Sequence, residues 1–328
     1  MNARFSPRRR CLVRLGSAWL LWCLIGCGIV HAQAWTLPKG ASYTKVSYGA
    51  STAAYQYTFD GRRTDFIDGL PGDTFKDRSL YLYSELGLWE HATLVLNVPY
   101  KRIFVRDHAF RFRVFGFGTA QIGLRVGLLP LFGVRPSSHA LALTGTLGVP
   151  TGYTRNYAPS VGTGQWDGQM GLHYGLSLWP FPGYAQAGAS VRYRSPLFLL
   201  SNAMECRPGN DIDCIPDRKP RYGHEMIYTG EVGLTPFDGI LLLQAMAGAI
   251  WSIDAPTVGF SALNPIPTHQ RAVKVGLGAG IYPFRLLRID ALRTLGFSAQ
   301  YYRTLGGRNA LDARELFLGI DYQRTRHP

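Results

Sequence analysis

The stretch that decides the fold reads Gly116-Phe117-Gly118-Thr119-Ala120-Gln121-Ile122-Gly123-Leu124-Arg125-Val126-Gly127-Leu128. From Ala120 to Leu128 every second residue is apolar, and the residues between them are polar or glycine. Successive side chains of a β-strand point to opposite faces, so this segment has one hydrophobic face and one polar, glycine-rich face. After a turn over Pro130–Ser138, the same alternation continues to Val149. Two such segments of about ten residues, joined by a short turn, are typical of a membrane β-hairpin.

The same alternation recurs along the rest of the chain and predicts about twelve strands. We expect them at 41–59, 80–88, 94–98, 119–128, 140–149, 170–178, 185–194, 228–234, 241–251, 273–282, 295–301 and 316–323. Short turns alternate with long polar loops, as in barrels with short periplasmic turns and long extracellular loops. The long loops are expected at 60–78, 106–113, 154–165, 196–223 and 255–269. The residues before the first strand, Trp35–Gly40, are expected to form a short leader that ends in a turn.

The predicted fold class is all-β, a transmembrane antiparallel β-barrel of about twelve strands. An unpaired backbone group in hydrocarbon costs several kcal/mol, so the first strand must pair with the last. A soluble sandwich is the alternative, in which the hydrophobic faces pack against each other. Aromatic residues at the ends of the apolar bands favour lipid, because barrels carry such girdles at both interfaces. These residues are Trp89, Tyr100, Tyr153, Trp166, Trp179, Tyr184, Tyr282 and Tyr301.

The first 34 residues have the pattern of a secretory signal peptide rather than of a folded segment. Five arginines and no acid lie in Met1–Arg14, an apolar run follows over Leu15–Val30, and Ala32-Gln33-Ala34 provides a small-x-small cleavage site. Cleavage after Ala32 is equally compatible. A rival interpretation uses Leu24–Cys27 as a lipoprotein box, which would leave Cys27 acylated. The expected organisation is a signal peptide over 1–34 and one barrel domain over 35–328, located in the bacterial outer membrane.

The chain beyond residue 34 is basic, with 30 Lys and Arg against 21 Asp and Glu. A basic surface binds nucleic acid, anionic surfaces or anionic solutes, and export makes nucleic acid an unsuitable partner. The expected partners are outer-membrane lipid and lipopolysaccharide, the machinery that assembles barrels, and a small solute. Tyr322 is expected to be the closing aromatic of the last strand, followed by a basic periplasmic tail.

Two cysteines, Cys206 and Cys214, remain outside the signal peptide. They lie in a stretch rich in Pro, Gly and Asp. In an oxidising compartment such a pair predicts a disulfide that closes a loop. A metal pair is the alternative, but no His lies between the two cysteines and their spacing is too wide for a zinc knuckle.

Polar and charged residues of the inward faces are the candidate lumen lining. They are Glu85, Asn97, Lys101, Gln121, Arg125, His173, Arg192, Arg194, Glu231, Gln244, Lys274, Glu315 and Asp321. In a barrel of this size they could line a narrow aqueous channel, where their charges tune selectivity. Alternatively, they pair with each other and fill the interior. The many inward glycines favour open space.

The sequence offers no sign of catalysis. A Gly-x-Ser-x-Gly elbow is absent, and no Ser is placed to act with His173, the one His well placed within a strand. His173 is therefore interpreted as part of a polar network. We expect no cofactor, no metal and no enzyme activity.

Short motifs give a more specific indication. They are Ala34–Gly40, Gly116–Thr119, Gly148–Gly152 and Gly162–Asp167. With these motifs the chain resembles an outer-membrane β-barrel family assigned to transport in the meta-cleavage pathway of phenol degradation. That family is distantly similar to the fatty-acid and aromatic-hydrocarbon channels of the outer membrane. Thr119 stands where family members commonly have Asp, so this motif matches in part.

The resemblance implies a passive outer-membrane channel for small hydrophobic or amphipathic molecules, and this is the expected function. Two alternatives remain open. One is a non-conducting barrel whose outer loops bind a polysaccharide or protein partner. The other is a barrel enzyme that modifies lipid.

Overall fold

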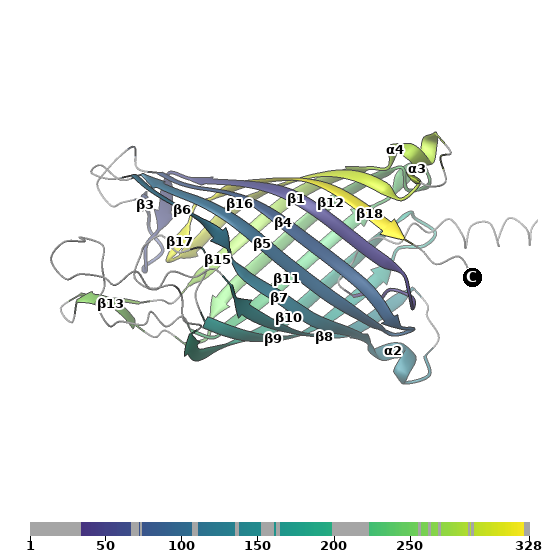
Figure 1. The fold of residues 1–328 in the computed structure, drawn as a ribbon, viewed down its shortest axis with the longest axis horizontal. Coiled ribbons are helices and arrows are strands. Elements are labelled where there is room, and N and C mark those ends of the chain that lie inside the picture. Colours follow the sequence, from purple (N-terminus) through teal and green to yellow (C-terminus); the bar gives the residue numbers. More distant parts are fainter. Residues whose placement is uncertain are drawn as a thin grey trace, which may run out of the picture.

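The computed structural model shows a closed antiparallel β-barrel with strongly tilted strands (Figure 1). It describes residues 34–324 except 67–71, 73, 107–110, 135–137, 152–160, 162–164, 199–222, 255–256, 262–263, 268–269, 288 and 290–291. The barrel strands are β1 (Ser42–Ala53), β4 (Thr74–Trp89), β5 (Ala92–Arg106), β6 (Arg111–Phe117), β7 (Thr119–Gly127), β8 (His139–Pro150), β9 (Gln165–Ser177), β10 (Gly183–Phe198), β11 (Glu225–Leu234), β12 (Leu241–Ser252), β15 (Arg271–Ile281), β16 (Leu295–Arg308) and β18 (Arg314–Arg324).

Closure comes from β1, which pairs with β4 on one side and with β18 on the other. β6 and β7 together make one spanning strand that is interrupted at Gly118, so the barrel has twelve strands, as predicted. Both parts pair with β5, whereas only β7 also pairs with β8. Apart from β6, each strand of the described barrel therefore has hydrogen-bonded strands on both sides, as a lipid environment requires.

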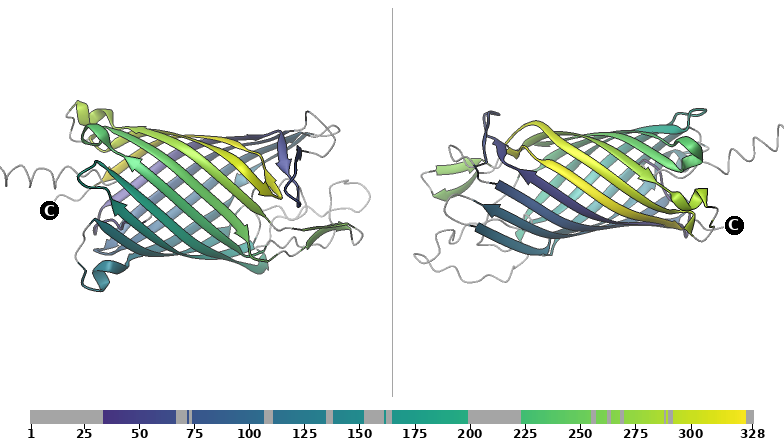
Figure 2. Two further views of the ribbon diagram at one scale, coloured as in Figure 1. Left: turned by 180° about the vertical axis from the view of Figure 1, so that it is seen from behind. Right: turned by 90° about the horizontal axis from the view of Figure 1, so that it is seen from above.

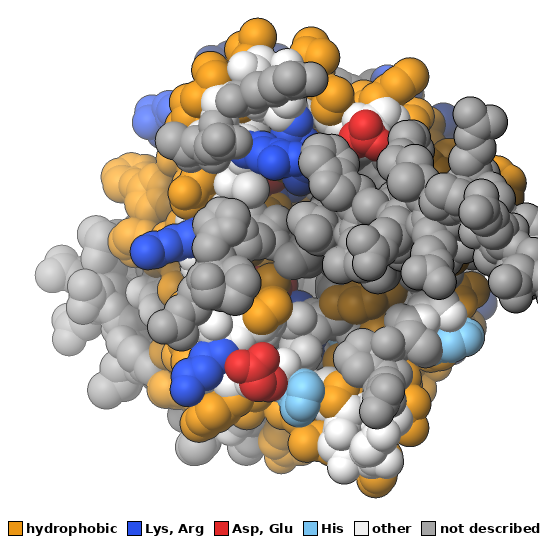
Figure 3. Space-filling model, turned by 90° about the vertical axis from the view of Figure 1, so that its right-hand side faces the viewer, with side chains coloured by type: hydrophobic (Ala, Val, Ile, Leu, Met, Phe, Trp, Pro, Cys, Tyr) orange, Lys and Arg blue, Asp and Glu red, His pale blue; other side chains and the backbone are white. Residues whose placement is uncertain are grey.

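The outer surface of the barrel wall is hydrophobic. The outward side chains along the strands include Val46, Leu277 and Leu318, which are 51%, 68% and 49% exposed. Exposing continuous bands of aliphatic side chains is unfavourable in water but favourable in lipid. The alternation found in the sequence therefore places its apolar residues toward lipid, and the soluble sandwich is wrong. Hydrophobic side chains also follow much of the outer contour when the molecule is viewed along the barrel (Figure 3).

The two ends of the barrel differ. Short connections, three of which contain one-turn helices, lie at one end: α2 (Leu128–Leu131), α3 (Pro236–Gly239) and α4 (Pro283–Leu286). The opposite end carries the longer connections and two small sheets, β13 (Thr257–Ser261) with β14 (Asn264–Pro267), and β2 (Tyr55–Tyr57) with β3 (Arg63–Asp65) and β17 (Ala310–Leu311) (Figure 2). By the rule for outer-membrane barrels, the short turns are periplasmic and the long loops extracellular.

Ion pairs hold the small extracellular sheet together. Arg63 Nε lies 2.7 Å from Asp312 Oδ2, and the guanidinium also stacks on the Tyr55 ring, 3.7 Å from its centroid. In the adjoining turn, a hydrogen bond from the Thr58 hydroxyl lowers the pKa of Asp60 to about 2. This sheet lies beyond the membrane-spanning part of the barrel.

Several predicted boundaries were wrong. The first strand ends at Ala53, because the chain bends at Ala54 and continues as β2 in the extracellular sheet rather than in the wall. β4 begins at Thr74, within the predicted loop 60–78, and the predicted loop 255–269 contains the hairpin of β13 and β14. Loop residues with polar side chains still form strands when a neighbouring strand extends beside them.

Two residues of the predicted aromatic girdle do not face lipid. Tyr184 is 4% exposed, and Tyr282 donates a hydrogen bond from its hydroxyl to the inward Asp321. Tyr184 alternates with the outward residues Ala185 and Ala187, so the strand directs it into the lumen. Tyr153 lies outside the described residues. The other aromatics of the set fit the girdle, with Trp89, Tyr100, Trp179 and Tyr301 exposed on the surface.

Candidate functional site: the lumen

The residues before β1 fold back into the periplasmic end of the barrel. This N-terminal segment, Ala34–Ala41, has Ala34, Leu37 and Ala41 at 2%, 3% and 1% exposure. Leu37 and Ala41 pack with Tyr43, and Tyr83 packs against this cluster from the neighbouring strand. The predicted turn at Lys39–Gly40 is present. The segment therefore fills lumen space that the sequence left to the wall side chains alone.

Backbone hydrogen bonds fix the N-terminal segment to three strands. The Leu37 amide donates to Thr93 Oγ1 at 2.7 Å, and the Gly40 amide donates to the Gly87 carbonyl at 2.8 Å. The Gly87 amide in turn donates to the Ala41 carbonyl at 2.9 Å. Arg125 Nη1 donates to the Trp35 carbonyl at 3.1 Å. Buried backbone groups outside regular structure need such partners, and the barrel wall supplies them.

Two glycines of the wall make room for the segment. A Cβ atom on Gly87 would lie 2.0 Å from the Pro38 carbonyl oxygen, and one on Gly175 would lie 2.3 Å from the Trp35 ring. Real Cβ atoms essentially never lie within 3 Å of a non-bonded heavy atom, so a larger residue at Gly87 cannot coexist with the seated backbone. Close approach of two backbones is a common reason for glycine within a strand.

A buried ion pair lies beside the segment. Arg125 Nη2 is 3.0 Å from Glu85 Oε1, and both side chains are almost fully buried. The Tyr83 hydroxyl donates to Glu85 and accepts from Arg125 at 3.3 Å. Arg125 thus joins two wall strands to the Trp35 carbonyl. An ion pair is costly to break in such a place, because the remaining charge would be left without a partner.

A second polar network continues around the periplasmic half of the lumen. Glu231 is its centre: it accepts from the Tyr184 hydroxyl, from Gln186 Nε2 at 3.1 Å and from Gln244 Nε2 at 2.6 Å. The Trp35 ring lies edge-on to the Tyr184 ring, with centroids 6.3 Å apart. The N-terminal segment therefore contacts both networks.

Charged pairs also line the extracellular half. Glu225 accepts from Arg194 Nη2 at 2.6 Å and from Arg192 Nη1 at 3.1 Å. Lys274 Nζ is 2.6 Å from Glu315 Oε1. The Glu225 pairs join the neighbouring strands β10 and β11, whereas Lys274 of β15 reaches past β16 to Glu315 of β18.

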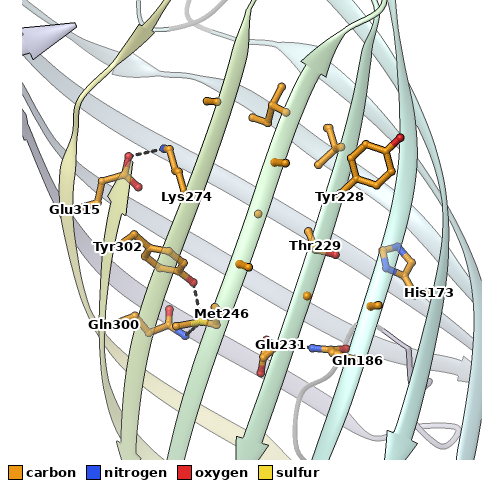
Figure 4. Close-up of a pocket in the computed structure, with 18 of the residues that line it drawn as sticks. His173, Gln186, Tyr228, Thr229, Glu231, Met246, Lys274, Gln300, Tyr302 and Glu315 are labelled. Atoms are coloured by element: carbon orange, nitrogen blue, oxygen red, sulfur yellow. Dashed lines mark hydrogen bonds and ion pairs between the residues drawn. The ribbon is translucent and has the colours of Figure 1, made fainter. Parts of the chain in front are cut away.

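A cavity of about 480 Å³ remains open between these networks, against the wall formed by β9 to β12, β15, β16 and β18 (Figure 4). Its lining is amphipathic. Ile227, Met246, Ile250, Ala272 and Phe317 provide apolar surface, while His173, Gln186, Thr229, Glu231, Lys274, Gln300, Tyr302 and Glu315 provide polar groups. The Tyr302 hydroxyl donates to Met246 Sδ at 2.9 Å, which leaves the thioether methyl group available to pack. Its volume lies within the range of small-molecule sites.

The predicted lumen residues occupy inward positions of the strand register and form distinct groups. Glu85 meets Arg125, Glu231 meets Gln244, Lys274 meets Glu315, Asn97 meets Gln121 at 3.1 Å, and Arg192 and Arg194 share Glu225. Lys101 lies 3.8 Å from Asp77, Asp321 accepts from Tyr282, and His173 lines the cavity. Interior charges do pair with each other, as the filled-barrel alternative supposed, yet a cavity persists beside them.

Sequence reasoning missed several functional residues. Asp77 lies within the predicted loop 60–78, and Glu225 lies before the predicted strand 228–234. Both alternate with outward residues once the strands are extended, so longer strands would have revealed them. The N-terminal segment has no periodic pattern at all. Its only local signal is the pair of apolar residues Trp35 and Leu37 ahead of the first strand.

Some predictions lie beyond the described residues. The signal peptide through residue 33, the lipoprotein alternative at Cys27 and the disulfide of Cys206 with Cys214 all belong to this group. Within the described ranges, no cluster of three or more His, Cys, Asp or Glu residues has the arrangement of a metal site. No helix in the described part of the chain has the length and apolar character needed to span a membrane.

Comparison with known proteins identifies the fold. No protein-family model matches the chain, and no curated protein sequence matches it either. Among solved structures, an outer membrane channel from Pseudomonas putida F1 superimposes with a TM-score of 0.65 at 16% identity, over 90% of this chain and 100% of that one. This likeness shows that the chain has the fold of an outer-membrane barrel.

Two further solved structures give lower scores. The CymD monoaromatic hydrocarbon channel has a TM-score of 0.41 at 8% identity, covering 89% of this chain and 90% of that one. A FadL homologue from Pseudomonas aeruginosa has a TM-score of 0.40 at 9% identity, covering 88% and 91%. At these scores neither likeness carries weight for the function of this chain.

Proposed function

We propose that the protein is a passive outer-membrane channel for small hydrophobic or amphipathic molecules. The observation that carries this proposal is the amphipathic cavity inside the barrel. Its apolar surface around Met246 and Phe317 suits a hydrocarbon or aromatic group, and the polar groups opposite suit one hydrophilic end.

The N-terminal segment has a defined role in this proposal. It lies in the periplasmic end of the lumen, hydrogen-bonded to β4, β5 and β7, and a solute would leave the cavity when the segment shifts. A plugged lumen explains how a barrel can pass selected small molecules without becoming a general pore for ions and sugars. The hydrogen bonds through Arg125 and Thr93 set how readily the segment yields.

The test is uptake of the apolar fluorophore N-phenyl-1-naphthylamine by cells with an intact lipopolysaccharide layer. Expression of the barrel should raise the rate of uptake, and Gly248→Phe should reduce this gain about tenfold. Gly248 lines the cavity, and a Cβ there would meet only the Tyr228 carbonyl oxygen at 3.7 Å, so Phe fits but occupies solute space.

Gly145→Phe is the matched control. Gly145 pairs with the outward Leu124, and a Cβ there would have no neighbour within 4 Å. The same substitution then points into lipid and should leave uptake unchanged. Equal uptake with and without the barrel, or equal loss in both variants, would contradict the proposed channel.

A further inference from the structure

A group of basic side chains faces outward just above the lipid-facing band on one side of the barrel. We define the basic belt as Lys76, Arg78, Arg102, Arg113, Arg303 and Arg314. All six are exposed, and they belong to β4, β5, β6, β16 and β18. These strands lie side by side in the sheet except that β1, which carries no belt residue, separates β4 from β18, so the belt covers one side of the wall.

The register fixes the height of the basic belt. Leu80 pairs with Tyr100, which pairs with Phe117, and these outward residues end the apolar band. One outward position further toward the long loops, Arg102 pairs with Phe115. On β18, Arg314 lies one outward position beyond Leu316, toward the long loops, and pairs with Arg303 of β16. The cations therefore lie at the boundary between hydrocarbon and headgroups, on the extracellular side.

Two of these cations converge on one aromatic ring. The Arg102 guanidinium lies 4.9 Å from the centroid of Phe104, and the Arg113 guanidinium lies 5.5 Å from the same centroid. Two like charges close to one ring repel each other, and an anion between them would offset that repulsion. Arginine is well suited to binding such an anion, since its planar guanidinium group binds phosphate through two hydrogen bonds.

No carboxylate supplies that anion within the described part of the chain. The ion pairs among the described residues involve none of the six belt residues. The acidic residues on the same strands alternate to the inside, where Asp77 and Glu315 pair with luminal lysines. As far as the described residues go, the belt thus presents positive charge toward the membrane without a carboxylate counterion.

The rest of the wall differs at this height. On β9, β10, β11 and β12 the outward residues near the extracellular ends are Trp166, Tyr193, Met226 and Trp251. An interfacial girdle of this kind anchors a barrel in any bilayer. The concentration of cations on β4 to β6, β16 and β18 is therefore a local feature rather than a general property of the rim.

We propose that the basic belt is a binding site for the phosphate groups of lipid A in lipopolysaccharide. The outer leaflet brings these phosphates to the height of the belt, above acyl chains that would pack on Tyr100, Phe115 and Phe117. Each Lys or Arg close to an anionic membrane surface strengthens binding roughly fivefold. This site is on the outer surface and is independent of what passes through the lumen.

The experiment is native mass spectrometry of the folded, detergent-solubilised barrel with defined lipids. The probes are diphosphorylated lipid A, the same lipid A without phosphates, and phosphatidylglycerol. The wild-type barrel should retain diphosphorylated lipid A at least tenfold better than the other two. Arg102→Gln with Arg113→Gln should reduce that retention at least tenfold, and Arg102→Lys with Arg113→Lys should restore part of it, because charge remains without the fork.

A matched control removes equal charge from the other rim. Arg293→Gln with Arg324→Gln changes two exposed arginines at the periplasmic end and should leave lipid A retention unchanged. Heat-modifiable gel mobility establishes that each variant is folded. Equal retention by wild type and the Arg102/Arg113 variant overturns the site, and so does equal retention of phosphatidylglycerol and lipid A by the wild type.

Discussion

Arg125 shows how one side chain links the wall of the barrel to its contents. It lies between Glu85, Tyr83 and the Trp35 carbonyl, and it is 3% exposed. The sequence identified Arg125 and Glu85 as inward residues because each alternates with leucine or valine. It did not reveal that they pair, since strand periodicity gives the face of a residue but not the reach of its side chain across neighbouring strands.

Replacing Arg125 should therefore cost more than the loss of one contact. We expect Arg125→Leu to lower the free energy of unfolding by about 3 kcal/mol, because the Glu85 carboxylate is left buried without a partner. Urea unfolding of the barrel in vesicles, followed by tryptophan fluorescence, measures this. The double variant Arg125→Leu with Glu85→Leu should recover most of the loss. A single variant as stable as the wild type would show that the pair contributes nothing.

At the scale of elements, the strands and the N-terminal segment are specified differently. A strand such as β7 can be predicted from its local sequence alone, because apolar and polar residues alternate over Thr119–Gly127. The N-terminal segment depends on partners far along the chain, since Leu37 bonds to Thr93 and Trp35 to Arg125. No local pattern encodes such contacts. The position of the N-terminal segment inside the lumen therefore could not be predicted from the sequence.

The seat of the N-terminal segment should be sensitive to a single methyl group. We expect Gly87→Ala to displace the segment, because the new Cβ would lie 2.0 Å from the Pro38 carbonyl oxygen while β4 itself can accept alanine. Hydrogen exchange of the peptide covering 34–41 should become at least tenfold faster, and conductance in planar bilayers should rise. Gly248→Ala, an inward glycine with free space, is the control. Unchanged protection in Gly87→Ala would place the segment elsewhere in the native protein.

At the scale of the whole molecule, the barrel separates two solvents across a wall one strand thick. Outward residues such as Leu318 face hydrocarbon, while neighbours such as Gln300 face the lumen, where Gln300 Nε2 lies 3.3 Å from Gln244 Oε1. This inside–outside division follows from period-two alternation and from closure, and both were predictable. The size and lining of the cavity were not, because they depend on which inward side chains pair and on what the N-terminal segment fills.

A substitution to arginine should thus reduce stability on the outward face of the wall and leave it nearly unchanged on the inward face. Leu318→Arg places a charge near the middle of the bilayer, where arginine costs roughly 2–4 kcal/mol. The free energy of unfolding of the barrel in vesicles, measured by urea titration, should fall by that amount. Gln300→Arg places the charge in the polar lumen and should change stability by less than about 1 kcal/mol, since Glu231 and Glu315 line the same cavity. Similar losses in both variants would mean that the outward face of β18 does not contact lipid. A loss confined to Leu318→Arg follows only if the alternation read along the chain sorts side chains between lipid and lumen.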